Sequence, residues 1–481
     1  MQEVKLYING KWVENHGGKV IDDVSPADGS VVAKVHTAGA EDVEAAIAAA
    51  QAAWPAWSKL LPADRELYLL KAADHLEKNA EKYAGWLMDE GGSGFIKAID
   101  EVGQSVSIWR AAAGECRRIN GGIIPVDTPD QLSTYIRCPL GVVAGIAPFN
   151  YPLLLALGKA ALAMAAGNAF VLKPSSDTPL SGVIIAECCE AAGIPDGVFN
   201  LIPGSGAVVG DAFTSDKRVR MVTFTGSTKV GSQIACGCAA HGKKYTLEMG
   251  GKNPLIVLAD YDVDQAVSVG IFGAYFHQGQ ICMGTNRIIV EEPIYDEFCA
   301  KFLERVKALK TGNLRDPAAV IGPLIKESQC AVLDGHIADA VAKGARLLCG
   351  GTHDGAWYAP SVLADVNNTM NVFYEESFGP LASIIKAKDA EDALTIANDS
   401  SYGLSSALLT NNLSLALDMA PRIEAGMVHV NDSTVMGSRQ APFGGIKSSG
   451  YGREGSSFSI EEFTELKWIT YQVKPHGYPT D

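Results

Sequence analysis

Short, mostly apolar runs alternate with segments of helical periodicity along much of the chain from Leu140 onward. The apolar runs are GVVAGIA, AFVLK, VFNLI and RMVTFT, and the helices predicted with them cover 152–166, 179–192, about 207–213 and 227–240. Strands that are apolar on both faces and separated by helices indicate a parallel sheet covered by helices on both sides. Such sheets bind ligands at the carboxyl ends of their strands, so we expect a binding crevice there.

A second alternating block begins at Asn253, and the Gly250-Gly251 pair marks the expected boundary. Its predicted helices lie near 262–275, 293–310 and 326–343. Ahead of both blocks, a β-rich start leads into a helix from Glu41 and a second helix over about 64–90. The apolar positions expected to form the buried face of this second helix are Leu67, Leu70, Ala73, Leu76, Ala80, Tyr83, Ala84 and Leu87. The chain is therefore predicted to be an α/β protein with two sheet-containing parts.

Two polar-apolar strands, QLSTYIR (131–137) and KWITYQV (467–473), fall outside both blocks. They are interpreted as a protruding ribbon used for assembly or as plain edge strands, and the pattern does not separate these two interpretations.

Composition narrows the class of protein. A chain of 481 residues is too long for one ordinary core and predicts two or three domains. Its net charge of −15, without a basic run, argues against nucleic-acid and anionic-membrane partners. The first residues lack the basic and apolar regions of a signal peptide, and no apolar run reaches the length of a membrane span. A cytoplasmic enzyme is the expectation.

The ten cysteines are scattered without the spacing of a disulfide framework, which predicts free thiols in a reducing compartment. The pairs Cys188-Cys189 and Cys236-Gly-Cys238 have neither a second cysteine pair nor histidines at zinc spacing. We therefore expect no metal site.

The turn FTGSTKVG places Gly226, Ser227 and Gly231 where a predicted strand ends and a helix begins. Backbone N–H groups and the helix dipole at such a turn suit a phosphate. The pattern differs from the G-x-G-x-x-G that follows the first strand of a standard dinucleotide-binding domain, so close packing is an equal interpretation of the turn alone.

Polar residues follow three other predicted strands. Asn150 follows GVVAGIA, Lys173 follows AFVLK and Glu248 follows YTL. Since the ends of parallel strands meet at one edge of a sheet, these side chains are expected to converge on one crevice.

Seven motifs together identify a resemblance. PFNYP, KPSS, FTGSTKVG, LEMGGKNP, GQICMGTNR, EESFGP and PFGGIKSSG occur in the order found in the aldehyde dehydrogenase superfamily. The resemblance runs from about residue 5 to 470 and is closest to the vanillin and benzaldehyde dehydrogenase branch. It implies a Rossmann-like cofactor domain (1–121 and 140–250), an α/β catalytic domain (251–446), an oligomerisation ribbon (122–139 and 465–475) and a return segment (447–464).

The resemblance also implies residue roles. Cys282 resembles the nucleophile, Glu248 the general base, and Asn150 the oxyanion donor that acts with the backbone N–H of Cys282. The residues that resemble cofactor contacts are Lys173, Ser176, Gly226, Ser227, Gly231, Glu376 and Phe378. Ser176 occupies a position where many strongly NAD-selective relatives carry glutamate, which predicts that both NAD and NADP are accepted.

The substrate is predicted to be an aromatic aldehyde. The expected pocket residues are Tyr151, Leu155, Gly158, His277, Arg439 and Phe443. Gly158 leaves space for a ring, whereas Arg439 leaves open an anionic substrate such as a semialdehyde. His277 and His429 are as readily explained by packing. A coenzyme A-acylating enzyme and a catalytically inactive homologue are alternatives that the retained Glu248 and Cys282 disfavour. The ribbon predicts a homodimer or homotetramer.

Overall fold

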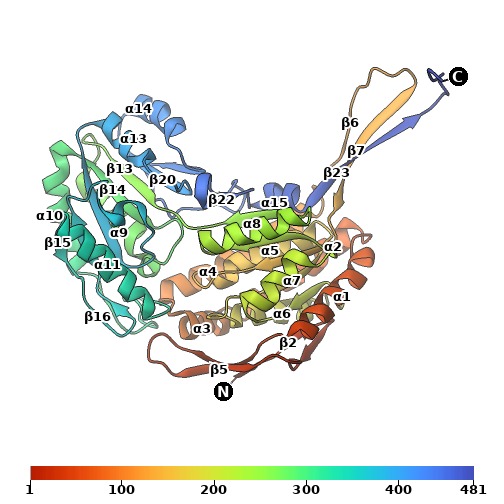
Figure 1. The fold of residues 1–481 in the computed structure, drawn as a ribbon, viewed down its shortest axis with the longest axis horizontal. Helices are drawn as coiled ribbons and strands as arrows, with labels where there is room; N and C mark the ends of the chain where they lie inside the picture. Colours follow the sequence, from red (N-terminus) through yellow and green to blue (C-terminus); the bar gives the residue numbers. More distant parts are fainter. Residues whose placement is uncertain (1, 481) are drawn as a thin grey trace.

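Two twisted sheets, formed by successive parts of the chain, organise the computed structural model, which describes residues 2–480 (Figure 1). The first sheet has eight strands in the order β22-β12-β11-β8-β9-β10-β2-β3. Its strands are β2 (Leu6–Ile8), β3 (Lys11–Val13), β8 (Val142–Ile146), β9 (Ala169–Lys173), β10 (Phe199–Leu201), β11 (Val219–Thr225), β12 (Lys244–Glu248) and β22 (Gly450–Tyr451). The strands from β12 to β10 are parallel, and the strand order reverses between β8 and β11. A parallel sheet binds its ligand at such a reversal.

Helices cover both faces of this sheet, as the apolar strands predicted. The side chains of β8 alternate between two cores: Val143 packs with α5 and α6, which are backed by α2, α3 and α4, and Val142 packs with α1, α7 and α8. These helices are α1 (Ala40–Trp57), α2 (Pro62–Lys78), α3 (Ala80–Gly91), α4 (Phe95–Glu115), α5 (Pro152–Ala165), α6 (Leu180–Ala192), α7 (Asp211–Ser215) and α8 (Thr228–Ala240), and a π-helical turn (Gly206–Gly210) precedes α7.

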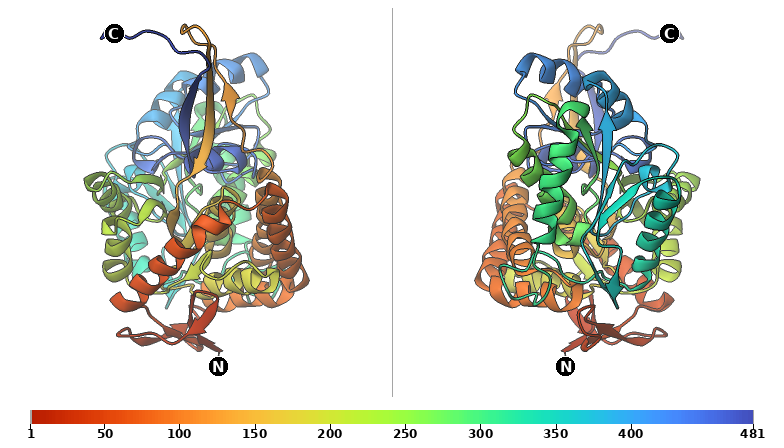
Figure 2. Two further views of the ribbon diagram at one scale, coloured as in Figure 1. Left: turned by 90° about the vertical axis from the view of Figure 1, so that its right-hand side faces the viewer. Right: turned by 90° about the vertical axis from the view of Figure 1, so that its left-hand side faces the viewer.

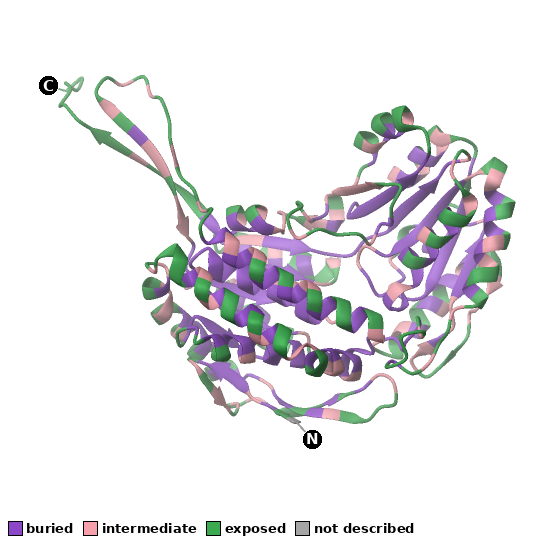
Figure 3. Ribbon diagram, turned by 180° about the vertical axis from the view of Figure 1, so that it is seen from behind, coloured by how far each residue is buried: buried purple, intermediate pink, exposed green. Residues whose placement is uncertain are grey.

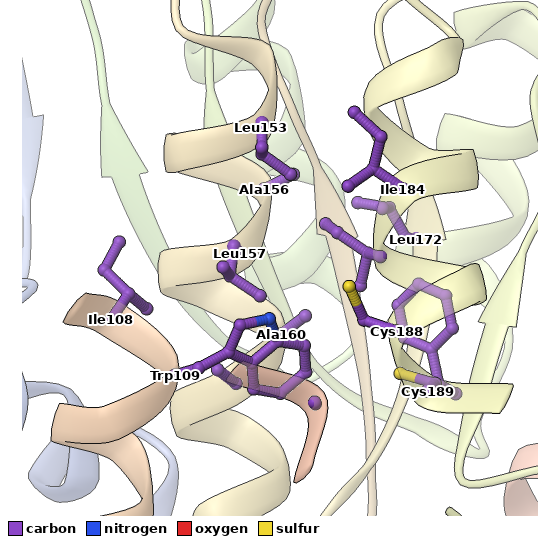
Figure 4. Close-up of a cluster of buried hydrophobic side chains, with 14 of the residues drawn as sticks. Ile108, Trp109, Leu153, Ala156, Leu157, Ala160, Leu172, Ile184, Cys188 and Cys189 are labelled. Atoms are coloured by element: carbon purple, nitrogen blue, oxygen red, sulfur yellow. The ribbon is translucent and has the colours of Figure 1, made fainter. Parts of the chain in front are cut away.

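Figure 4 shows the core between α4, α5, β9 and α6. Trp109, Leu157 and Leu172 meet there, and Cys188 and Cys189 belong to the same cluster. Both thiols are free and buried. Within residues 2–480 no group of three or more acidic, histidine or cysteine side chains is arranged to hold a metal ion.

The predicted helix over 64–90 is wrong in one respect, because it is two helices. Asn79 ends α2, and its side-chain amide donates to the His75 carbonyl at 2.8 Å, which satisfies one of the last carbonyls of that helix. The buried face is also shifted, since Leu67 and Leu70 are 52% and 38% exposed. The long helix α4 was not predicted.

Buried glutamates of α4 and α3 hold the first residues of α5 and α6, the helices that pack on the first sheet. Glu101 of α4 accepts hydrogen bonds from the backbone N–H groups of Leu153 and Leu154 at 2.9 and 3.1 Å, and Glu90 of α3 accepts one from Leu180 at 2.9 Å. The first N–H groups of a helix lack partners within the helix and favour a negative charge. The start of α5, directly after Asn150, is therefore held by a residue about fifty positions earlier in the chain.

The second sheet has the order β15-β18-β19-β14-β13-β20-β21, and only β15 runs antiparallel to its neighbour. Its strands are β13 (Asn253–Val257), β14 (Thr285–Glu291), β15 (Arg346–Cys349), β18 (Ser361–Ala364), β19 (Leu381–Ala387), β20 (Ser405–Leu409) and β21 (Met427–Val430). The associated helices are α9 (Val263–Tyr275), α10 (Tyr295–Lys307), α11 (Ser328–Ala342), α12 (Asn371–Tyr374), α13 (Ala390–Asn398) and α14 (Leu413–Met419). Helices α9 and α10 pack on one face and α11 and α13 on the other. In Figure 3 the strands of both sheets are mostly buried, and the exposed residues gather on the outer sides of the helices.

A slender ribbon projects from the body beside α15 (Ser456–Glu462) (Figures 1 and 2). It consists of β6 (Gly122–Ile123), β7 (Gln131–Pro139) and β23 (Thr464–Gln472), so the two strands predicted outside the blocks pair with each other. Smaller elements complete the chain: β1 (Gln2–Val4), β4 (Val20–Val24) and β5 (Val31–His36) form a three-stranded sheet near the N-terminus, and β16 (His353–Asp354) pairs with β17 (Trp357–Tyr358). Among the helices within residues 2–480, none has the length and apolar character that a membrane crossing requires.

Candidate active site

Cys282 lies in the loop that connects α9 to β14. This loop opens with a tight turn in which His277, Gln278 and Gly279 all have positive φ, at 51°, 54° and 69°. Only glycine adopts that conformation freely, so the turn is held from outside. The Gln278 amide donates to the carbonyls of Gly92 and Pro323 at 3.0 and 2.9 Å.

Two side chains, one on β13 and one in the segment after β21, fix the loop on the far side of Cys282. The Asn253 amide donates to the Cys282 carbonyl at 2.8 Å, and the Thr434 hydroxyl donates to the Met283 carbonyl at 2.7 Å. A Cβ atom on Gly251 would lie 2.6 Å from the Cys282 carbonyl oxygen, so only glycine allows this close approach. The backbone on both sides of the thiol is therefore rigidly placed.

Two cavities meet at Cys282 and Asn150, which line both. The first, here called the sheet-edge cleft, has a volume of about 630 Å³ and follows the carboxyl ends of β8, β9, β11 and β12. The second, the front cavity, has a volume of about 380 Å³ and runs between α4, α5 and the segment 435–439. A thiol at the junction can react with a molecule in the front cavity while a second molecule occupies the sheet-edge cleft.

Asn150 is 3% exposed and points toward the loop of Cys282. Its side-chain amide donates to the Gln280 carbonyl at 2.9 Å. A primary amide has two N–H donors, so one remains for a ligand at the junction.

Glu248 ends β12 beside this junction. It is 2% exposed, and neither carboxylate oxygen has a hydrogen-bond partner within residues 2–480. A Cβ on Gly444 would lie 2.7 Å from one of these oxygens, so glycine keeps the space beside them open. Burial, followed by repulsion from Glu454, raises the pKa of Glu248 well above 4.5. Glu454 forms an ion pair with the buried Lys159.

Among residues 2–480, no cation lowers the pKa of the Cys282 thiol. Burial, then the negative charges of Glu248 and Glu376, raise its pKa to about 12. At neutral pH the thiol is protonated, so its reaction requires a group that accepts the proton. Glu248 is an acidic group close enough to affect the thiol electrostatically, and its raised pKa suits it to that task.

The sheet-edge cleft fits a dinucleotide. Of the seven predicted contacts, six line it: Lys173, Ser176, Gly226, Ser227, Glu376 and Phe378. Ser227 caps α8 by accepting a hydrogen bond from Val230, which directs the first turn of this helix into the cleft. Gly231 does not line it, contrary to expectation: a Cβ there would lie 2.3 Å from the Met249 sulfur, so this glycine serves close packing.

A basic and an acidic side chain line the cleft from different elements: Lys173 ends β9, and Glu376 lies in the loop between α12 and β19. Burial lowers the pKa of Lys173 to about 8, and its amine donates only to the adjacent Pro174 carbonyl among the described residues, at 3.1 Å. Burial raises the pKa of Glu376 to about 7, and this carboxylate accepts a hydrogen bond from the Gly251 N–H at 3.0 Å. Both groups retain hydrogen-bonding capacity for sugar hydroxyls.

The front cavity contains five of the six predicted pocket residues, Tyr151, Leu155, Gly158, Arg439 and Phe443. His277 is the exception. Its ring packs edge-to-face on Tyr151 with centroids 5.7 Å apart, but it lines a different cavity. The residues that the sequence interpretation missed include Ile96, Asp100, Gln104 and Ile108 of α4, together with Phe272 and Phe276. The four on α4 were missed because that helix was not predicted.

Neighbouring side chains in the cavity wall partly offset the positive charge of Arg439. It donates a hydrogen bond to the Gln104 side chain, and Asp100 is the acidic residue with the largest effect on its pKa. Burial lowers its pKa, yet a guanidinium remains charged.

Residues 12–469 match the model of the aldehyde dehydrogenase family, and the chain belongs to this family. It is 41% identical to vanillin dehydrogenase of Pseudomonas fluorescens, with all of both chains covered. It is also 39% identical to the NADP(+) succinate-semialdehyde dehydrogenase of Escherichia coli, over 96% of each chain. Among solved structures, salicylaldehyde dehydrogenase from Pseudomonas putida G7 complexed with salicylaldehyde superposes with a TM-score of 0.98 at 38% identity, with both chains covered completely. The protein is an NAD(P)-dependent aldehyde dehydrogenase.

Proposed function

We propose that the protein oxidises an aromatic aldehyde, such as a hydroxylated benzaldehyde, to its carboxylic acid. The observation that carries this proposal is the front cavity, which leads to Cys282 past Gly158. A Cβ at Gly158 would meet only Ile108, at 3.9 Å, so the glycine leaves the cavity open at this point. Leu155 and Phe443 line the same cavity, and a mostly apolar pocket with a few polar partners suits a ring. The similarity to vanillin and salicylaldehyde dehydrogenases supports the same substrate class.

The reaction follows from the groups at the junction. Glu248 accepts the thiol proton, and the Cys282 sulfur adds to the aldehyde carbon to give a thiohemiacetal. The oxyanion receives hydrogen bonds from the Asn150 amide and the Cys282 backbone N–H. Removing one such preorganised donor costs about 3–4 kcal/mol in related sites.

A nicotinamide dinucleotide supplies the hydride acceptor when bound. The residues that would hold it are Lys173 and Glu376 at the ribose, Gly226 and Ser227 at the phosphates, and Phe378 beside the nicotinamide. Oxidation leaves the acyl group on Cys282 as a thioester. Glu248 loses the thiol proton to solvent and then removes a proton from water. The resulting hydroxide attacks the thioester carbon, and the departing Cys282 thiolate takes this proton back from Glu248 as the acid is released.

We propose that both NAD and NADP are accepted. Ser176 lines the sheet-edge cleft three residues after Lys173. A serine hydroxyl can bond to a ribose hydroxyl or to a 2′-phosphate, and it has no charge that would repel the phosphate.

A semialdehyde is the second candidate because Arg439 places a cation in the front cavity. The similarity to the succinate-semialdehyde enzyme supports it. The hydrogen bond to Gln104 and the proximity of Asp100 weaken Arg439 as a carboxylate receptor, so we place the aromatic class first.

We propose that the ribbon, residues 122–139 with 465–475, joins copies of the chain into a dimer or tetramer. We propose further that residues 1–121 with 140–250 act as the cofactor domain and residues 251–446 as the catalytic domain. The cytoplasm is the proposed compartment, supported by ten free cysteines.

The test is a panel of benzaldehyde, vanillin, salicylaldehyde, acetaldehyde and succinic semialdehyde, each with NAD and NADP, with and without coenzyme A. We expect the aromatic aldehydes to have the highest kcat/KM and coenzyme A to have no effect. Cys282→Ala should abolish turnover and retain cofactor binding, whereas Cys299→Ala, at a buried position on α10, should retain activity.

Gly158→Trp separates the two substrate classes. The indole would fill the front cavity, so aromatic substrates should lose at least tenfold in kcat/KM and acetaldehyde much less. A clear preference of the wild type for succinic semialdehyde, lost in Arg439→Ala, would establish the anionic class instead.

A further inference from the structure

His277 lines a third cavity, which lies beside the front cavity. This lateral cavity has a volume of about 360 Å³ and lies next to the loop of Cys282. Ile96, Phe272 and Phe276 line both cavities and form the wall between them. His277 and Gln278 lie on the lateral side of that wall.

Two buried side chains that line the lateral cavity carry polar atoms without a hydrogen-bond partner among the described residues. Within residues 2–480, neither ring nitrogen of His277 nor the side-chain oxygen of Gln278 has a partner, although these residues are 2% and 0% exposed. A buried polar atom without a partner costs about 1–3 kcal/mol, and such atoms in native proteins call for an explanation. Burial, followed by the positive charge of Lys97, lowers the pKa of His277 and outweighs the opposite effect of the Asn150 backbone, so the ring is neutral and has one donor and one acceptor nitrogen.

Of the two cations that line this cavity, one is ion-paired with a carboxylate and the other is not. Lys97 is buried, ion-paired with Glu101 at 2.5 Å and bonded to the Ser93 hydroxyl at 2.9 Å. Arg305, on α10, is exposed and donates to the Ser268 hydroxyl at 2.6 Å, and no carboxylate of the described chain forms an ion pair with it. The inner part of the cavity is therefore uncharged overall, and its outer part carries one uncompensated positive charge.

We propose that the lateral cavity is a second ligand site for a small hydroxylated aromatic carboxylate. Its hydroxyl would bond to His277 and Gln278, its ring would pack on Phe272 and Phe276, and its carboxylate would face Arg305. The cavity is comparable in volume to the front cavity, at about 360 against about 380 Å³, so a single substituted ring fits.

Occupancy of this site affects the front cavity through the shared wall. The rings of Phe272 and Phe276 lie 5.1 Å apart, and Phe272 is 42% exposed, which leaves it free to change rotamer when the lateral cavity is empty. A ligand packed against these rings restricts that change. A ligand in the lateral cavity is therefore expected to change the rate of aldehyde oxidation without competing with the aldehyde for the front cavity. The ligand class follows from this cavity alone and does not depend on the proposed substrate.

The test uses 4-hydroxybenzoate as the probe and isothermal titration calorimetry on the full-length protein. Val320→Trp fills the lateral cavity from a position that is 38% exposed, and Gly158→Trp fills the front cavity. We expect Val320→Trp to weaken probe binding at least tenfold and Gly158→Trp to leave it within twofold. Steady-state kinetics with the best aldehyde should show a mixed or noncompetitive effect of the probe, which Val320→Trp removes.

Two cationic residues on α10 supply a test variant and its matched control. Arg305→Gln should weaken the probe about fivefold or more, whereas Lys307→Gln, an exposed cation on α10 that does not line the cavity, should not. Phenol, which lacks the carboxylate, should bind more weakly than 4-hydroxybenzoate and be insensitive to Arg305→Gln. No binding of the probe to the wild type, or binding abolished by Gly158→Trp and unchanged by Val320→Trp, would overturn the proposal.

Discussion

Glu248 is a side chain whose placement opposes stability and favours reactivity. Its carboxylate is 2% exposed and lacks a hydrogen-bond partner within residues 2–480. The same burial raises its pKa and makes it a stronger proton acceptor. Two measurements separate these effects.

The first measurement concerns deacylation. If Glu248 activates the hydrolytic water, Glu248→Gln should release about one equivalent of reduced cofactor per site in a stopped-flow burst and then turn over at least a hundredfold more slowly. The burst requires that another base, such as water, can accept the thiol proton, so it should grow as pH rises toward the pKa of Cys282, which is about 12. Glu304→Gln, at an exposed position on α10, is the control. Normal steady-state turnover of Glu248→Gln would contradict the role.

The second measurement concerns stability against pH. The folded-state pKa of Glu248 lies above its unfolded value, so ionisation favours the unfolded state as pH rises from about 4.5 to the folded pKa. Stability is lost over that window in the wild type and retained in Glu248→Gln. The variant should melt about 1–3 °C higher at pH 8 and at nearly the same temperature at pH 4.5. A lower melting temperature of the variant at pH 8 would show that the ionised carboxylate has a stabilising partner.

The residues at strand ends were predictable from the sequence, and His277 was not. Asn150, Lys173 and Glu248 follow apolar strands, and parallel strands bring such positions to one edge whatever the intervening helices do. The direction of the His277 ring depends instead on the sign of one backbone angle, φ = 51°, which the contacts of Gln278 enforce. The pattern of apolar and polar positions along the sequence does not predict that backbone angle.

At the scale of elements, α4 shows why a helix can escape prediction. Lys97, Glu101 and Ser105 lie at intervals of four residues on its buried side, so polar residues occupy positions where the pattern requires apolar ones. Hydrogen bonds explain their burial: Lys97 is ion-paired with Glu101, the Ser105 hydroxyl donates to the Glu101 carbonyl, and the Glu101 carboxylate caps α5. Three helices of the second sheet, α9, α10 and α11, were predicted, and their observed bounds lie within three residues of the predicted ones.

The loop after β9 is the element on which cofactor choice is expected to depend. Ser176→Glu should raise the KM for NADP at least tenfold, because a carboxylate would repel a 2′-phosphate, and should change the KM for NAD less than threefold. Initial rates with both cofactors at saturating aldehyde measure this difference. Ser215→Glu, which adds the same charge at an exposed site on α7, is the control. A wild type that already rejects NADP by several orders of magnitude would contradict the argument.

At the scale of the whole molecule, the ribbon is the feature that a monomer would not be expected to retain. Leu466 and Trp468 of β23 are 61% and 67% exposed on one side of a thin three-stranded sheet. Exposed apolar surface on a projecting sheet is typical of an interaction site. The sequence suggested the two strands, and their pairing across more than 300 residues identifies them as one structure.

Leu466→Glu should therefore lower the oligomeric mass. A charge placed on the apolar side of the ribbon would be buried in an interface, which costs several kcal/mol. Light scattering after gel filtration at micromolar concentration should report a smaller species than the wild type. Lys467→Gln alters the neighbouring position on the opposite side and should not change the mass. An unchanged mass for Leu466→Glu would place the interface elsewhere.

The return of the chain to its starting sheet has a consequence for damage by proteases. After completing the second sheet, the chain comes back as β22, where Gly450 pairs directly opposite Glu248, and continues through β23 beside β7. Met436 to Ser438 are exposed in the segment between, which is also a wall of the front cavity. A single cut there severs the backbone but leaves both fragments hydrogen-bonded into the same sheets. The nicked protein would keep its elution volume and its bound cofactor while losing the wall that holds the aldehyde, so intact mass in a native separation would not report an intact enzyme.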